Sequence, residues 1–97
     1  MMPKLYEYLG LIVLFYSNEH EPIHVHGKYQ GRESRAELVI REGLVVEIIY
    51  SRVGGRRPLE GSQLKDFQTL VGHYADDIVR KWIDYFVLHR RVEAEVI

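Results

Sequence analysis

The pattern of apolar and polar positions predicts four β-strands in the first half of the chain. The expected strands are residues 9–16, 23–29, 34–40 and 44–50. The first is an apolar run too short for an ordinary helix, and the third alternates so that Ala36, Leu38 and Ile40 are expected to point inward. Short connections throughout predict an antiparallel meander.

After Pro58 the apolar positions recur every three or four residues, which is typical of one face of a helix. These positions are Leu64, Phe67, Val71, Tyr74, Ile78, Trp82, Tyr85 and His89. We predict one long helix over residues 63–88, with Gly72 as the position at which it could bend or break. Residues 92–97 alternate again and could add a short strand to this sheet or to a partner's.

The predicted fold class is therefore α+β, a four-stranded antiparallel meander packed on one long C-terminal helix. One sheet face covered by one amphipathic helix buries both apolar surfaces. The other face is expected to be solvated or to form an interface.

The length, charge and amino-acid composition of the chain exclude several functional classes of protein. The 97 residues favour a single domain spanning residues 1–97. The net charge of −1 gives no overall attraction to nucleic acid. The absence of cysteine excludes disulfides and thiolate zinc sites. No apolar run approaches the roughly 20 residues that span a bilayer. With no signal-peptide pattern at the N-terminus, we expect a cytoplasmic protein without a membrane partner.

Candidate chemistry is concentrated in residues 15–26, which read FYSNEHEPIHVH. His24 and His26 are separated by one residue, so on a strand both imidazoles leave the same face. The pair could be structural, could bind a divalent metal with His20 as a further ligand, or could act as general acid and base in phosphodiester cleavage. Glu37 and His73 are further candidate metal ligands.

Two more groups complete the candidate site. Glu19 could hold an imidazole in one tautomer, as a carboxylate behind a catalytic or metal-bound histidine does. Arg56 and Arg57, in the loop that follows the fourth predicted strand, could hold a phosphate group.

With these residues in place, the sequence resembles the small bacterial and archaeal family called domain of unknown function 4160. The resemblance rests on a strand, a polar turn and Pro-x-His-x-His, followed later by aromatic residues on the C-terminal helix. The matching positions are Tyr16, Asn18, Glu19, His20, Pro22, His24, Val25, His26, Trp82, Tyr85 and Phe86. Many members carry a second proline directly before the first histidine of the pair, where this chain has Ile23. The resemblance implies no catalytic residue, but it implies an association with toxin–antitoxin-type systems.

Three functional hypotheses follow. The first is a non-enzymatic regulatory or interaction module of a toxin–antitoxin-like pair. It would bind a protein encoded by a neighbouring gene, and it could form a homodimer through a sheet edge or the C-terminal strand. The second is a small RNA-cleaving enzyme with His24 and His26 as acid and base. The third is a metal-binding protein that uses the same histidines.

Overall fold

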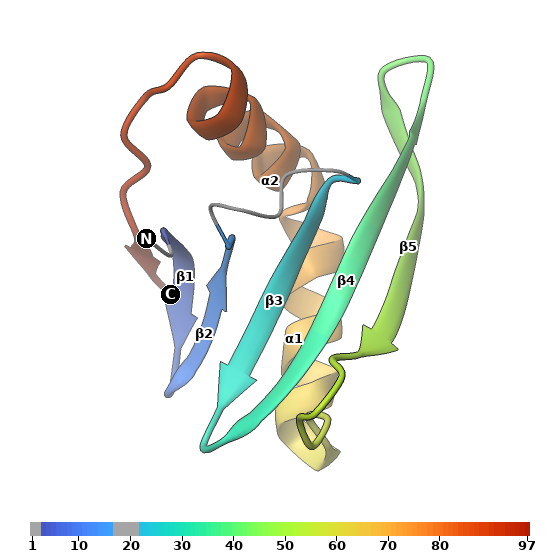
Figure 1. The fold of residues 1–97 in the computed structure, drawn as a ribbon, viewed down its shortest axis with the longest axis vertical. Helices are drawn as coiled ribbons and strands as arrows, with labels where there is room; N and C mark the ends of the chain where they lie inside the picture. The colour runs from blue at the N-terminus through green and yellow to red at the C-terminus, as the bar shows by residue number, and fades with distance from the viewer. Residues whose placement is uncertain (1–2, 17–21) are drawn as a thin grey trace.

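The computed structural model describes residues 3–16 and 22–97. Within these residues the chain forms a six-stranded mixed sheet in the order β5-β4-β3-β2-β1-β6, with the helices on one side of it (Figure 1). The elements are β1 (Lys4–Tyr8), β2 (Leu11–Leu14), β3 (His24–Tyr29), β4 (Arg32–Arg41), β5 (Leu44–Arg52), α1 (Gly61–His73), α2 (Ala75–Trp82), the π-helical turn η1 (Ile83–Val87) and β6 (Glu95–Val96).

The α+β class is confirmed, but the four-stranded meander is wrong. The predicted strand over residues 9–16 contains a turn, and the preceding residues form β1. Leu9 and Gly10 have φ of 46° and 89°, so they close a two-residue hairpin between β1 and β2. Leu9 extends the apolar run in sequence, yet its side chain is 80% exposed because it lies at the tip of this turn.

The single long helix is also wrong. α1 ends at His73, and α2 begins at Ala75 after Tyr74, whose φ of −101° and ψ of 16° depart from helical values. The break lies at Tyr74 rather than at Gly72, and the Tyr74 ring stacks on the Tyr6 ring of β1 at 4.7 Å between centroids. We infer that this tertiary contact sets the position of the bend.

The short strand expected near the C-terminus is confirmed as β6. It pairs in parallel with β1, so Tyr6 lies opposite Glu95 at the edge of the sheet. Figure 1 shows the C-terminal end of the chain near this edge, beside β1. The parallel pair makes the sheet mixed, because the other neighbouring strands are antiparallel.

The core lies between the sheet and the helices. Its buried apolar side chains include Val13, Val25 and Ala36 from the sheet and Phe67 and Ile78 from the helices. The predicted inward positions Ala36 and Leu38 are buried, whereas Ile40 is only partly buried. The helix-facing side of the sheet therefore carries most of the apolar packing.

A polar cluster ties α2 and β6 to β1. The Tyr6 hydroxyl donates to the Asp77 carboxylate, and the Lys81 ammonium lies 3.2 Å from Asp77 Oδ2 and 2.7 Å from Glu95 Oε2. Burial by itself would raise the pKa of Asp77, but the hydrogen bonds from Tyr6 and Lys81 and the charges of Lys81 and Arg80 lower this pKa below its usual value of 3.8. Burial and the bond to Asp77 raise the pKa of the Tyr6 hydroxyl.

Asp77→Asn is expected to lower the free energy of unfolding at pH 7 by about 1–3 kcal/mol, because it weakens charge-assisted hydrogen bonds. Since the folded pKa lies below the unfolded one, the ionised carboxylate stabilises the fold above about pH 4, and this contribution disappears as the pH falls through the folded pKa. Thermal melts from pH 7 to pH 3 should therefore show the gap between wild type and variant closing. The exposed neighbour Asp76 supplies the control, Asp76→Asn, and a gap that stays constant with pH would contradict the assignment.

Candidate functional site

His24 and His26 project from the sheet face that points away from α1. Gly27, the residue directly after His26, faces the Phe67 ring of α1, and successive residues of a strand leave opposite faces. The two imidazole centroids are 5.3 Å apart, so the prediction of one shared face is confirmed. The expectation that this face is solvated is wrong for the pair, because both histidines are only 4% exposed.

Glu33, on the neighbouring strand β4, holds His26 in place. His26 Nδ1 lies 2.8 Å from Glu33 Oε2, and the Tyr16 hydroxyl donates to the same oxygen at 2.9 Å. Tyr16 also packs edge-on against the His26 ring, with the centroids 4.4 Å apart. Arg56 Nε lies 3.7 Å from the other carboxylate oxygen, and Glu33 itself is 2% exposed. A buried carboxylate is thus contacted by a phenol, an imidazole and a guanidinium.

The hydrogen bonds define the orientation of both rings. His24 Nδ1 lies 2.6 Å from the backbone carbonyl of Pro22, which can only accept, so Nδ1 of His24 carries the hydrogen. His26 Nδ1 donates in the same way to Glu33. In a neutral imidazole the lone pair then resides on Nε2. Histidines that bind metals or act as general bases are commonly oriented by such a bond to Nδ1.

The structure brings together only part of the predicted site. Arg56 reaches Glu33, whereas Arg57 contributes its backbone carbonyl, which accepts from Glu33 N at 2.8 Å. Glu19 and His20 lie outside the described residues, so their roles stay predictions. Glu37 is the cross-strand partner of His24, while His73 belongs to α1. Among residues 3–16 and 22–97, no group of three His, Cys, Asp or Glu side chains could hold a metal ion.

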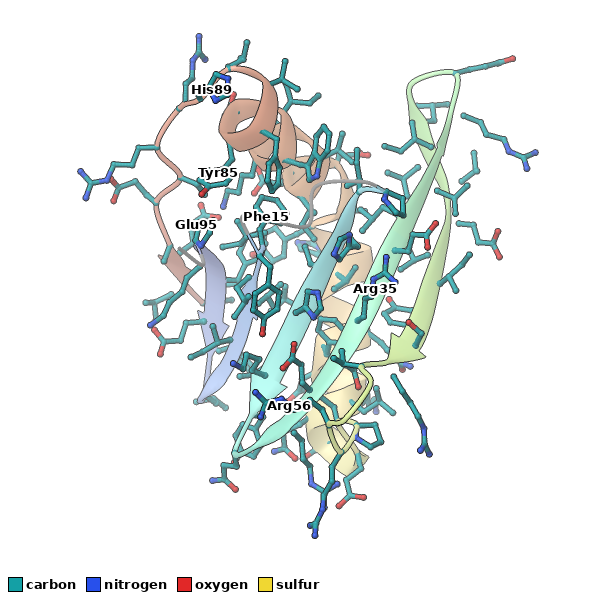
Figure 2. All side chains as sticks on the ribbon, viewed as in Figure 1. Phe15, Arg35, Arg56, Tyr85, His89 and Glu95 are labelled. Atoms are coloured by element: carbon teal, nitrogen blue, oxygen red, sulfur yellow. The ribbon has the colours of Figure 1, made fainter. Side chains whose placement is uncertain are left out.

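Glu33 and Arg35 are members of this face that the sequence reasoning missed. The signal was the Gln30–Gly31 turn, whose φ values of 46° and 79° close a two-residue hairpin. That hairpin places Glu33 opposite Lys28 and Arg35 opposite His26. Figure 2 shows Arg35 over the middle of β4 and Arg56 near its lower end. Arg35 Nε is buried and has no hydrogen-bond partner within the described part of the chain.

A second surface lies at the β5 edge of the sheet, where the described chain places no further strand. Leu44, Val46 and Ile49 of β5 are 66%, 55% and 43% exposed. A groove of about 540 Å³ runs beside this strand, between β5 and the junction of α1 with α2, and Gly72 and Ala75 form part of its wall. This edge combines a long unpaired backbone with exposed apolar side chains.

Fold and site together define an α+β protein built on one mixed sheet, with a buried histidine–glutamate cluster on one face and an uncovered strand at one edge. The family model described as Domain of unknown function (DUF4160) matches residues 10–83, and the chain belongs to this family. No curated protein and no solved structure matches the chain. None of the helices in the described residues is both long and apolar enough to cross a membrane.

Proposed function

We propose that the protein is a non-enzymatic interaction module that binds a partner protein by adding one strand of that partner to β5. The observation that supports this most directly is the edge itself. β5 is a nine-residue strand at one end of the sheet, and it exposes Leu44, Val46 and Ile49. Long apolar edges of this kind pair readily with a strand from another chain.

The histidine cluster supports a structural role within such a module. Both imidazoles are almost fully buried, and Glu33 links Tyr16, β3 and the loop after β5 through its side chain and backbone. These contacts hold β4 in a fixed position, and β4 in turn pairs with β5 along most of its length. The cluster would therefore keep the docking strand rigid, which reduces the entropy lost on binding.

The partner we propose is the protein encoded by a neighbouring gene, in a toxin–antitoxin-like pair. This part of the proposal depends on the family resemblance and on the edge strand. The overall charge of −1 favours a protein over a nucleic acid as the partner of this surface.

The test is co-expression with the neighbouring gene product, followed by size-exclusion chromatography with light scattering and by titration calorimetry. Val46→Lys/Ile49→Lys should weaken binding on the order of 100-fold, because two charges would be desolvated at the new strand pair. The matched control is Val96→Lys on β6, at the opposite edge of the sheet, where Val96 is 80% exposed. This control should bind as the wild type does.

Two results would overturn the proposal. One is that the protein encoded by the neighbouring gene does not bind the wild-type chain, or that it binds the β5 double variant as tightly as the wild type. The other is a stable homodimer of the wild type that the same double variant dissociates, since β5 would then pair with a second copy instead. Because Val46 and Ile49 are exposed, the double variant should keep its stability within about 1 kcal/mol of the wild type.

A second candidate function, RNA cleavage, is favoured by one specific observation. The Glu33–His26 bond is the arrangement that orients a general base, and positive charge is near it, because Arg35 is the cross-strand partner of His26 and Arg56 lies 3.7 Å from Glu33. We rank this candidate second because a phosphodiester must reach the reacting nitrogen, and both histidines are almost fully buried.

If the RNA-cleaving alternative holds, the purified wild type should cleave a single-stranded RNA in a metal-free buffer. His24→Ala should then lower the cleavage rate by about 10²–10⁴-fold, as expected for loss of a general acid or base. Gel analysis of labelled RNA provides the measurement, with His89→Ala as the control because His89 is exposed and lies after η1. Equal rates for wild type and His24→Ala would reject this alternative.

A further inference from the structure

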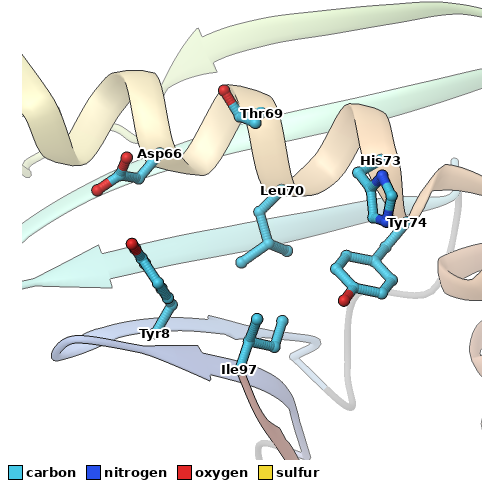
Figure 3. Close-up of a pocket in the computed structure, with 7 residues that line it drawn as sticks. All are labelled: Tyr8, Asp66, Thr69, Leu70, His73, Tyr74 and Ile97. Atoms are coloured by element: carbon cyan, nitrogen blue, oxygen red, sulfur yellow. The ribbon is translucent and has the colours of Figure 1, made fainter.

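A cavity of about 360 Å³ lies on the opposite side of the sheet from the histidines, between β1, α1 and the residue that follows β6 (Figure 3). Its apolar wall is formed by Leu70 of α1 and by Ile97, which is held by a backbone hydrogen bond from its N–H to the Glu7 carbonyl at 2.8 Å. A volume of this size is at the lower end of the range for small-molecule sites.

Two phenol rings and one carboxylate border this apolar wall. Tyr8 approaches from β1 and Tyr74 from the junction of α1 with α2, and Figure 3 shows Asp66 and Tyr8 on the same side of the cavity. Asp66 is partly buried, and its carboxylate forms no hydrogen bond or ion pair with the other described residues. The lining residues include no lysine or arginine, and the His73 imidazole, which is among them, packs against the Tyr74 ring in a T-shaped arrangement with 4.7 Å between the centroids.

We propose that this cavity binds a small organic cation with an apolar body, of the arylalkylamine class. The apolar body would pack against Leu70 and Ile97, and the ammonium group would pair with Asp66. Tyr8 adds an aromatic ring, and such rings attract cations through their π faces, whereas the Tyr74 ring is already stacked on Tyr6 and adds apolar surface. The carboxylate is therefore complementary to the charge of such a molecule. The aromatic and apolar side chains are complementary to its body.

The site is separate from the proposed docking edge. β1 is separated from β5 by three strands, β4, β3 and β2. A ligand here would therefore be a property of the chain alone, and its detection requires no partner protein. Failure of the docking proposal and failure of this one are thus measured in different experiments.

The test is methyl NMR of the full chain, titrated with phenethylamine and, separately, with phenylacetate. The two probes share a ring of the same size and differ in the sign of their charge. Phenethylamine should shift the methyl signals of Leu70 and Ile97, and phenylacetate should bind at least about tenfold more weakly. Asp66→Asn should reduce the affinity for phenethylamine about tenfold, whereas the control Asp76→Asn, outside the cavity, should leave it unchanged.

Four outcomes would overturn the inference. The first is that phenethylamine shifts neither Leu70 nor Ile97, and the second is that both probes bind with equal affinity. The third is that Asp66→Asn binds phenethylamine as the wild type does. Equal shifts at the methyl groups of Val46 on β5 would also count against it, because they would indicate non-specific attraction of the amine to the protein.

Discussion

Gly27→Ala is expected to destabilise the protein by about 1–3 kcal/mol, the usual range for an overpacked core. A Cβ atom at Gly27 would lie 2.6 Å from Cδ1 and 2.7 Å from Cε1 of Phe67. Phe67 is completely buried in the α1 interface, so its ring has no open space into which it can move. For a chain of this size, each kcal/mol should lower the melting temperature by about 4–8 °C.

A double-mutant cycle with Phe67→Leu isolates this contact. Phe67→Leu removes ring atoms that the new methyl group would meet, so Gly27→Ala should be less harmful in that background. Gly72→Ala is the opposite control, because Gly72 lies in α1 and an added Cβ there would meet nothing within 4 Å. It should stabilise the protein by about 0.5–1 kcal/mol. If Gly27→Ala leaves the stability unchanged, the proposed close packing of Gly27 against Phe67 is contradicted. It is also contradicted if the changes in stability caused by Gly27→Ala and Phe67→Leu simply add.

Glu33→Ala is expected to lower the free energy of unfolding by about 3–5 kcal/mol. The substitution removes the acceptor shared by the partly buried Tyr16 hydroxyl and the buried His26 Nδ1. Arg56 also loses the carboxylate at 3.7 Å, but its exposed position makes that part small. Urea denaturation monitored by circular dichroism measures the loss of folding free energy.

Glu37→Ala provides the matched control, because Glu37 lies on the same strand and the same face, opposite His24. Among the described residues its side chain forms no ion pair with any lysine, arginine or histidine, so the expected change stays below about 1 kcal/mol. Glu33→Gln keeps an acceptor oxygen and should recover part of the stability. Equal losses in Glu33→Ala and Glu37→Ala would show that Glu33 does not organise the histidine face.

Much of the sheet was predictable from local pattern. The turns at Gln30–Gly31 and Glu42–Gly43 end at a glycine with φ near 80°, and β4 between them alternates between buried and more exposed positions. The third turn of this type, Leu9–Gly10, was missed because Leu9 continues an apolar run. Its exposure follows from the turn geometry, and hydrophobicity alone does not reveal it.

The site was predictable only in part for a similar reason. The spacing of His24 and His26 was sufficient to place both rings on one face. Their partner Glu33 comes from a different strand, and its position depends on the register of β3 with β4. Arg35 is brought beside His26 by the same register. Burial of the pair could not be inferred, since alternation distinguishes two faces of a strand without saying what covers each.

The sequence by itself determined the local elements of this protein: strands from alternation, turns from glycine, helical segments from the three- and four-residue period, and the shared face of two histidines. The tertiary structure alone decided the parallel pairing of β6 with β1, the break at Tyr74 and the contact of Phe67 with Gly27. The physical reason is that periodicity and turn preference act between near neighbours along the chain. Pairing, stacking and close packing depend on residues that meet only after the chain has folded.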